Sequence, residues 1–194
     1  MRSKSILFVD LDRTLFDTSR FVEAIRNELK LQFQVVMTTN EARNYYRYYE
    51  DLYDYDFFKH CQDRGVTSQQ IYDCIFPELL IKYGSFLYED VRSLLGTEFE
   101  IMTFGSEPYQ SLKLKMAPEL QDRAVTIVHE RKGAYINREF KNVSVTLIDD
   151  KPAAMTGYSA GTFIHLDRAQ KVPIINDESG IHIRSLNHTK EVLS

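Results

Sequence analysis

The chain has 194 residues, of which 43% are hydrophobic and 27% are charged, and its formal net charge is -4. This composition is typical of a globular protein and excludes a disordered or fibrous one. A net negative charge gives no general attraction to nucleic acid, and no apolar run approaches the roughly 20 residues that span a bilayer. We therefore expect a cytoplasmic protein without nucleic-acid or membrane partners, in which an anionic substrate meets a local positive patch or a metal ion.

The apolar run Ile6-Leu7-Phe8-Val9 predicts a buried strand, and Asp10-Leu11-Asp12-Arg13-Thr14 follows it directly. Side chains alternate along an extended chain, so Asp10 and Asp12 can turn their carboxylates to the same side. Neighbouring carboxylates raise each other's pKa unless a cation or a proton lies between them, which makes this pair a candidate metal and acid/base site. An acidic turn that ends a strand is the alternative, because Asp and Thr are ordinary turn residues.

About ninety residues with little strand character separate this strand from the next, which is more than one crossover helix requires. Phe21, Ile25 and Leu29 repeat at the spacing of one helical face. Thr67 opens a capping box, and Pro77 should end or kink the helix that follows it. We therefore expect a small helical cap over residues 17–85, inserted into a core formed by residues 1–16 and 86–194.

The insert contains an unusual cluster of aromatic residues, in which Tyr and Phe recur between positions 45 and 58. Such a cluster could be a stacking surface for a nucleobase or another ring. Tyr45, Tyr49, Leu52 and Tyr53 fall on one helical face, however, which favours packing between helices of the cap.

Four further apolar runs, at 99–103, 124–128, 143–148 and 162–166, predict buried strands, and helical stretches separate most of them. A helix is expected from Leu87 to Gly96, before the first of these runs. This alternation predicts an α/β fold with a doubly wound parallel sheet. A short strand and a terminal helix are expected after residue 172.

Ligands bind beyond the carboxyl ends of the strands in such open sheets. Asp10 follows the first predicted strand, Thr103 ends the second, and Asp149 and Asp150 end the strand at 143–148. The sequence therefore predicts that Asp10, Asp12, Asp149, Asp150 and the Thr103 hydroxyl gather at one edge of the sheet.

The segments that carry these residues resemble the four ordered motifs of the haloacid dehalogenase superfamily. They are, in chain order, Phe8 to Leu15, Ile101 to Thr103, Lys132, and Thr146 to Asp150. The resemblance spans residues 6 to about 166 and implies a Rossmann-like core. The helical insert directly after the first motif matches the cap position of the phosphatase-like branch.

The resemblance implies that Asp10 is a nucleophile that accepts a phosphoryl group, and that Asp12 is the general acid and base. A dehalogenase of the superfamily would typically lack this second Asp, so Asp12 favours phosphate esters over haloacids. Thr103 would donate its hydroxyl to a phosphoryl oxygen, assisted by backbone amides near Phe104 and Gly105.

The position of Lys132 before Asp149 is similar to that of the family's third motif, and its ammonium would hold Asp10 ionised and offset phosphate charge. Lys113 and Lys115 are alternatives, but their place in a predicted helix indicates solvated charges. Magnesium is the expected cofactor. Its ligands would be the carboxylates of Asp10 and of Asp149 or Asp150, with the backbone carbonyl of Asp12.

Arg13 departs from the family pattern, in which glycine is frequent at this position. A bulky cation there could narrow access to the site or bind a second anionic group of the substrate. Thr14 is expected to brace the loop through local hydrogen bonds.

The function expected from these features is that of a magnesium-dependent phosphatase, which hydrolyses a small phosphorylated metabolite through an aspartyl-phosphate. A phosphotransferase or mutase on the same core is one alternative, and a catalytically weak binding or regulatory protein is another. The partner is then a small-molecule phosphate ester, whose identity the sequence leaves open together with the oligomeric state.

Overall fold

The computed structural model describes residues 5–49, 52–156, 158, 161–178 and 180–193. The chain divides into two compact units. The first, called the core unit, comprises Met1–Phe16, Leu87–Phe104 and Asp122–Ser194. The second, called the insert unit, comprises Asp17–Phe86 and Gly105–Gln121.

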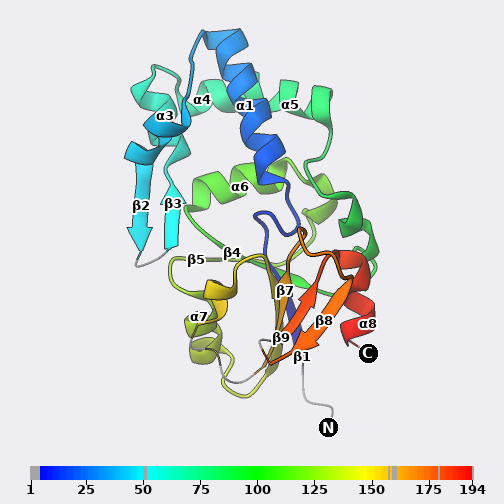
Figure 1. Cartoon of the computed structure of the whole chain (residues 1–194). Coiled ribbons are helices and arrows are strands. Elements are labelled where there is room, and N and C mark those ends of the chain that lie inside the picture. The colour runs from blue at the N-terminus through cyan, green and yellow to red at the C-terminus, as the bar shows by residue number, and fades with distance from the viewer. Residues whose placement is uncertain (1–4, 50–51, 157, 159–160, 179, 194) are drawn as a thin grey trace. The chain divides into compact units, whose positions relative to one another are not determined.

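The core unit is built on a seven-stranded sheet in the order β5-β4-β1-β6-β7-β9-β8 (Figure 1). Its strands are β1 (Ser5–Val9), β4 (Glu100–Phe104), β5 (Val125–Val128), β6 (Ser144–Asp149), β7 (Thr162–Leu166), β8 (Ile174–Asp177) and β9 (Gly180–Ile183). Every neighbouring pair is parallel except β8 and β9. The α/β fold with a parallel sheet is therefore confirmed, with an antiparallel strand added at one edge.

Both faces of β1, an interior strand of the sheet, are covered. Phe8 and Val9 are consecutive and fully buried, and consecutive strand residues point to opposite faces of a sheet. On one face Phe8 packs in a cluster with Met102, Leu147 and Ile136. Ile136 belongs to α7 (Lys132–Glu139), so this cluster anchors α7 on the sheet and fixes the position of its first residue.

The remaining helical segments of the core unit are short. They are η3 (Glu89–Ser93), η5 (Pro152–Met155), η6 (Leu186–His188) and α8 (Thr189–Leu193). The helix expected from Leu87 to Gly96 is wrong, because only η3 forms there. The Tyr88 amide donates to the Leu15 carbonyl, and Leu87 bridges to Phe16, so the start of this segment pairs with an extended chain instead of coiling.

The insert unit is largely helical (Figure 1). Its helical segments are α1 (Thr18–Phe33), α2 (Thr39–Ala42), η1 (Arg43–Tyr45), α3 (Phe57–Asp63), α4 (Ser68–Gln70), the π-helical η2 (Ile71–Ile75), α5 (Phe76–Tyr83), α6 (Glu107–Lys115) and η4 (Pro118–Leu120). The predicted face of α1 is buried at Phe21, Ile25 and Leu29. The capping box at Thr67 is confirmed.

Pro77 does not end the helical segment in which it lies. It occupies the first turn of α5, directly after η2. Proline is tolerated there because the first amides of a helix have no intrahelical partner. The expected end of the helix at Pro77 is therefore wrong, although the helix type changes beside it, from the π-helical η2 to α5.

The middle of the aromatic cluster forms a β-hairpin, while Tyr45 lies in η1 and Phe57 and Phe58 lie in α3. β2 (Tyr46–Tyr49) pairs antiparallel with β3 (Leu52–Tyr55). The helical face predicted for Tyr45, Tyr49 and Tyr53 is thus wrong, because aromatic residues favour strands and stabilise them by cross-strand contacts. The Tyr46 and Tyr53 rings stack with their centroids 4.9 Å apart.

The segment that follows β4 groups with the insert unit. Tyr109 of α6 stacks on Phe57 at 5.2 Å, and the Phe86 amide donates to the Met116 carbonyl. Lys113 is buried, with its ammonium 4.2 Å from the centre of the Tyr109 ring, so the interpretation of Lys113 as a solvated charge is wrong. Lys115 is exposed as expected.

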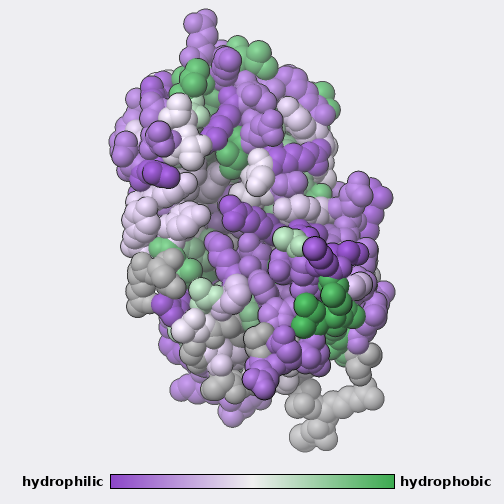
Figure 2. Space-filling model, viewed as in Figure 1, coloured by the Kyte–Doolittle hydropathy of each residue, from purple (hydrophilic) through white to green (hydrophobic). Residues whose placement is uncertain are grey.

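Among the described residues, no helix has both the length and the apolar character needed to cross a membrane. Figure 2 shows that the visible face is hydrophilic over most of its area, with a hydrophobic patch in the region of the edge strand β8. Val172, which precedes β8, is among the exposed apolar residues.

The cap of α1 gives a first testable expectation. The Asp17 carboxylate accepts a hydrogen bond from the Arg20 amide at 3.0 Å and caps the helix. Asp17→Ala removes this acceptor and should lower the free energy of unfolding by about 1 kcal/mol. Asp17→Asn keeps an acceptor and should lower the free energy of unfolding much less. Urea denaturation measures both values, and equal losses would show that the hydrogen bond is not what matters.

Candidate active site

The sheet places the first three site residues at one edge. The Asp10 amide donates to the Ile148 carbonyl at 2.9 Å, which fixes Asp10 where β1 ends. Asp149 is the last residue of β6, the neighbour of β1 on one side. Thr103 lies near the end of β4, the neighbour on the other side. The carboxyl ends of three adjacent parallel strands therefore present these side chains together.

Lys132 completes the group from the first turn of α7. Its ammonium donates to Asp10 Oδ1 and, at 2.6 Å, to Asp149 Oδ2. The exposed fractions of Asp10, Lys132 and Asp149 are only 4%, 4% and 1%. Buried charges are costly unless they are paired and hydrogen-bonded. One buried cation is thus shared by two buried carboxylates from different strands.

Three carboxylates form a group of the size of a metal site. Asp10, Asp149 and Asp150 each offer an oxygen, and these oxygens lie within 4.8 Å of one another. The second oxygen of Asp149 accepts from the Lys151 amide at 2.7 Å, which orients that carboxylate. Hard oxygen donors of this kind suit Mg²⁺. The side chain of Asp12 is not in this group, which is consistent with a role for its carboxylate other than metal binding.

The electrostatics of the group favour an added positive charge. Burial raises the pKa of Asp10 to about 8, with Lys132 opposing and Asp149, Asp12 and Asp150 adding to the rise. Burial and the neighbouring Asp149 raise the pKa of Asp150 to about 6. Burial also opposes the charge of Lys132, but Asp10 and Asp149 together raise its pKa. One ammonium therefore does not balance the carboxylates, and a divalent cation fits the donors present.

Thr103 carries a buried hydroxyl with no hydrogen-bond partner in the part of the chain that the structure describes. Leaving a buried hydroxyl unsatisfied costs about 1–3 kcal/mol, which a ligand oxygen would recover. Phe104 ends β4, and Gly105 follows in the insert unit with φ 139°. Only glycine adopts such a φ readily.

Arg13 has a left-handed backbone with φ 61°, a conformation that glycine adopts more readily than other residues. Its side chain is exposed, and its charge lowers the pKa of Asp150 against the effect of burial. The prediction that the Thr14 hydroxyl holds the loop by local hydrogen bonds is wrong, because this buried hydroxyl has no partner among the described residues. The Thr14 carbonyl is bonded instead, by Arg168 Nη2 at 2.8 Å.

Sequence reasoning missed Arg168 and Asp90. Arg168 lies two residues after β7, at the same strand edge as Asp10 and Asp149, and this position is a signal that could have found it. Asp90 lies in η3 and carries no local signal. His165 also contacts the site, since its Nε2 is 3.2 Å from the backbone carbonyl of Asp150. Its other ring nitrogen is 3.0 Å from His182.

No family sequence model matches the chain, and no curated protein matches it in sequence. Solved structures match it in fold. A haloacid dehalogenase-like hydrolase from Burkholderia xenovorans has a TM-score of 0.59 at 18% identity, covering 97% of this chain and 96% of that one. A HAD hydrolase from Bacillus subtilis, bound to magnesium, has a TM-score of 0.55 at 14% identity and covers both chains fully, at 100% each.

A third structure, a haloacid dehalogenase-like family hydrolase from Xanthomonas campestris, has a TM-score of 0.56 at 10% identity and covers 100% of this chain and 96% of that one. These likenesses extend over nearly the whole chain, so they include more than an isolated sheet. The Rossmann-like fold that the motifs imply is therefore confirmed as the fold of haloacid dehalogenase-like hydrolases.

The shared ammonium leads to a stability expectation. Lys132→Met leaves Asp10 and Asp149 buried without their cation, so the folded protein will hold a proton that the unfolded chain releases. The free energy of unfolding then falls as the pH rises above the unfolded pKa of Asp. We expect a loss of about 3–5 kcal/mol at pH 8 and a smaller loss at pH 5.

Urea denaturation with a chelator present measures this difference. Lys141→Met, which removes an exposed ammonium from the same unit, is the matched control and should be nearly neutral at both pH values. If Lys132→Met is no more destabilising than this control, the ammonium is not what holds the two carboxylates together.

Proposed function

From the fold that the chain shares with haloacid dehalogenase-like hydrolases, we propose that it is a magnesium-dependent phosphatase of that superfamily, acting on a small phosphorylated metabolite. The observation that carries this proposal is the buried contact of Lys132 with Asp10 and Asp149. It gives a carboxylate nucleophile a fixed orientation beside a metal-type group of oxygens. The same proposal includes the predicted division into a core, residues 1–16 with 86–194, and a cap, residues 17–85.

In the first step an Asp10 oxygen attacks the phosphorus, and the bond from phosphorus to the ester oxygen breaks. Asp12 gives its proton to the departing alkoxide, which leaves as an alcohol, and Asp10 becomes an acyl phosphate. In the second step a water molecule gives its proton to Asp12 and attacks the phosphorus. The bond from the Asp10 oxygen to phosphorus breaks, inorganic phosphate leaves, and both carboxyl groups return to their initial state.

The remaining site residues bind and orient the phosphoryl group. Lys132 keeps Asp10 in place and favours its ionised form during the attack, since its ammonium already donates to that carboxylate. The Thr103 hydroxyl donates to a phosphoryl oxygen, which satisfies the hydroxyl that is otherwise unpaired among the described residues. Backbone amides near Phe104 and Gly105 serve the same oxygens.

Mg²⁺ would be held by Asp10, by Asp149 or Asp150, and by the backbone carbonyl of Asp12, and it would offset the charge of the incoming phosphate. Arg13 is an exposed cation of this edge, and it would bind a second anionic group of a substrate that carries one.

Loss of the nucleophile tests the proposal directly. Phosphate release from a panel of phosphorylated metabolites should require Mg²⁺, and Asp10→Asn should lower it by about 10³-fold or more, because an amide cannot form the acyl phosphate. Asp122→Asn makes the same change at an exposed position of the core unit and should retain full activity. Mg²⁺-dependent phosphoryl transfer to another acceptor, without release, would instead support the phosphotransferase alternative.

Metal binding is tested separately by calorimetric titration with MgCl₂. Asp150→Asn removes one of the three clustered oxygens and should weaken binding by about tenfold or more. Saturating Mg²⁺ should also raise the thermal midpoint of the unaltered protein, because it binds only the folded state. Asp122→Asn again serves as the control, and equal affinity in both variants would place the ion elsewhere.

A further inference from the structure

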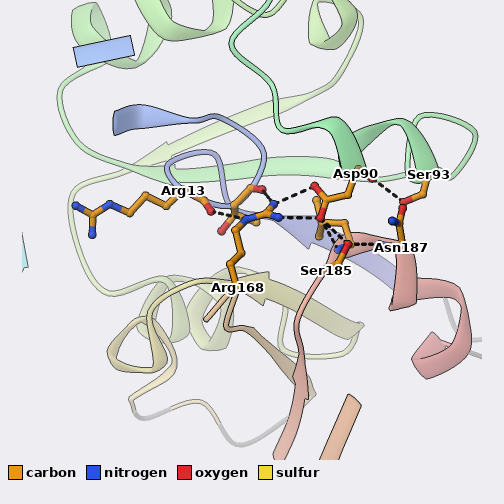
Figure 3. Close-up of polar contacts among 8 residues, drawn as sticks. Arg13, Asp90, Ser93, Arg168, Ser185 and Asn187 are labelled. Carbon is orange, nitrogen blue, oxygen red and sulfur yellow. Dashed lines mark hydrogen bonds and ion pairs between the residues drawn. The ribbon is translucent and has the colours of Figure 1, made fainter. Parts of the chain in front are cut away.

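The guanidinium of Arg168 contacts the loop that follows the proposed nucleophile. Its Nη2 donates to the Thr14 carbonyl at 2.8 Å, and its Nε donates to the Arg13 carbonyl at 3.4 Å. Both contacts are made with the backbone, and Figure 3 shows that the Arg13 side chain points away from Arg168. Arg168 therefore holds the course of the chain at these two residues and does not depend on the identity of their side chains.

Asp90 orients this guanidinium. Its two carboxylate oxygens accept from Arg168 Nη1 at 2.8 Å and Nη2 at 3.1 Å, which is the paired geometry that arginine forms with carboxylates. The Ser185 hydroxyl and the Leu186 amide also donate to Asp90, at 2.7 and 3.0 Å (Figure 3). Burial opposes ionisation of Asp90, but its bonds to Arg168 and Ser185 hold its pKa below the ordinary value.

One face of the guanidinium lies against an aromatic ring, with its carbon 3.8 Å from the centre of Tyr88. Tyr88 also donates its amide to the Leu15 carbonyl. The ring and the carboxylate together leave Arg168 little rotational freedom. A guanidinium fixed in this way loses little further entropy when it binds the two carbonyls of the loop.

The contacted loop has an unfavourable backbone. Arg13 has a φ of 61°, a conformation that is disfavoured for residues with a Cβ. The peptide before its Cα is held by the hydrogen bond from the Arg13 amide to the Phe16 carbonyl at 2.8 Å. The peptide after it is held by Arg168. The peptide between Asp12 and Arg13 contains the carbonyl of Asp12, so the conformation at Arg13 sets the position of Asp12.

We propose that Arg168, oriented by Asp90, is a positioning residue that fixes the Arg13–Thr14 turn and thereby places the Asp12 carboxyl for proton transfer. This inference rests on the proposed role of Asp12 as general acid. Lysine cannot replace Arg168, because one ammonium cannot reach both carbonyls while it pairs with both oxygens of Asp90.

The test compares two substrates that differ in their need for a proton. An alkyl phosphate has a poor leaving group and depends on the general acid, whereas p-nitrophenyl phosphate has a good one and depends on it little. The second step, in which Asp12 accepts a proton from water, is common to both esters, so the comparison uses kcat/KM, which reports the first step. In Arg168→Lys we expect kcat/KM for the alkyl ester to fall by about 10²-fold and kcat/KM for p-nitrophenyl phosphate to fall by less than tenfold. A purely structural role of Arg168 would lower both rates equally.

A double-mutant cycle links the effect to Asp12. Adding Arg168→Lys to Asp12→Asn should cost little further activity on the alkyl ester, because the group being positioned is already absent. Arg184→Lys is the matched control: Arg184 lies in the same unit, is exposed, and donates to the Lys171 carbonyl at 3.4 Å. It should leave both rates unchanged. Full additivity of Arg168→Lys with Asp12→Asn would overturn the proposal.

Amide hydrogen exchange tests the turn without any substrate. In Arg168→Lys the Arg13 amide should exchange about tenfold faster, while the Asp10 amide, which is bonded to Ile148 in the sheet, should not change. Unchanged exchange at Arg13 would overturn the proposal even if activity fell. If the unaltered protein hydrolyses no phosphate ester, the proposed function fails, and exchange at Arg13 then decides alone whether Arg168 holds the turn.

Discussion

The buried ammonium of Lys132 is the interaction on which the rest of the site depends. Asp10 and Asp149 lie at the ends of adjacent strands with almost no exposure, and two carboxylates in that position repel each other strongly. Lys132 offsets this repulsion from a third element, α7. Its position follows from ordinary packing, because Ile136 of the same helix belongs to the apolar cluster on one face of the sheet. The packing of α7 thus positions the ammonium of Lys132, and this ammonium stabilises the buried pair of Asp10 and Asp149.

The carboxylates at this edge carry more negative charge than Lys132 offsets, and this excess explains how an acidic chain could act on an anion. Burial, with the neighbouring carboxylates adding to its effect, raises the pKa values of Asp10 and Asp150 in spite of Lys132, so a proton or a further cation is favoured beside them. A phosphate cannot approach such a group without further positive charge. The same arrangement that would repel a substrate is therefore the one that favours a divalent cation, so metal binding and substrate binding would be coupled through charge.

The sequence predicted the features that depend on local pattern and on sheet geometry. Alternating strands and helices predicted the sheet, and the rule that strand ends gather at one edge predicted the neighbourhood of Asp10 and Asp149. It did not predict the hairpin of β2 and β3, because tyrosines at these positions fit both a helical face and two alternating strands. It also missed the pair of Arg168 and Asp90, which are 78 residues apart. Only the folded chain brings these two side chains together.

The Arg13 turn shows how a chain can do without the glycine that its backbone favours. A residue with a Cβ costs about 1–2 kcal/mol in the left-handed region, and at Arg13 both flanking peptides are held by hydrogen bonds, from its own amide to Phe16 and from Arg168 to its carbonyl. Glycine would adopt the same φ without this help, but it would also leave it more easily. An arginine at this position adds charge near Asp150, and the bonds that stabilise its backbone make the turn rigid. Rigidity beside Asp12 is what proton transfer in a fixed direction requires.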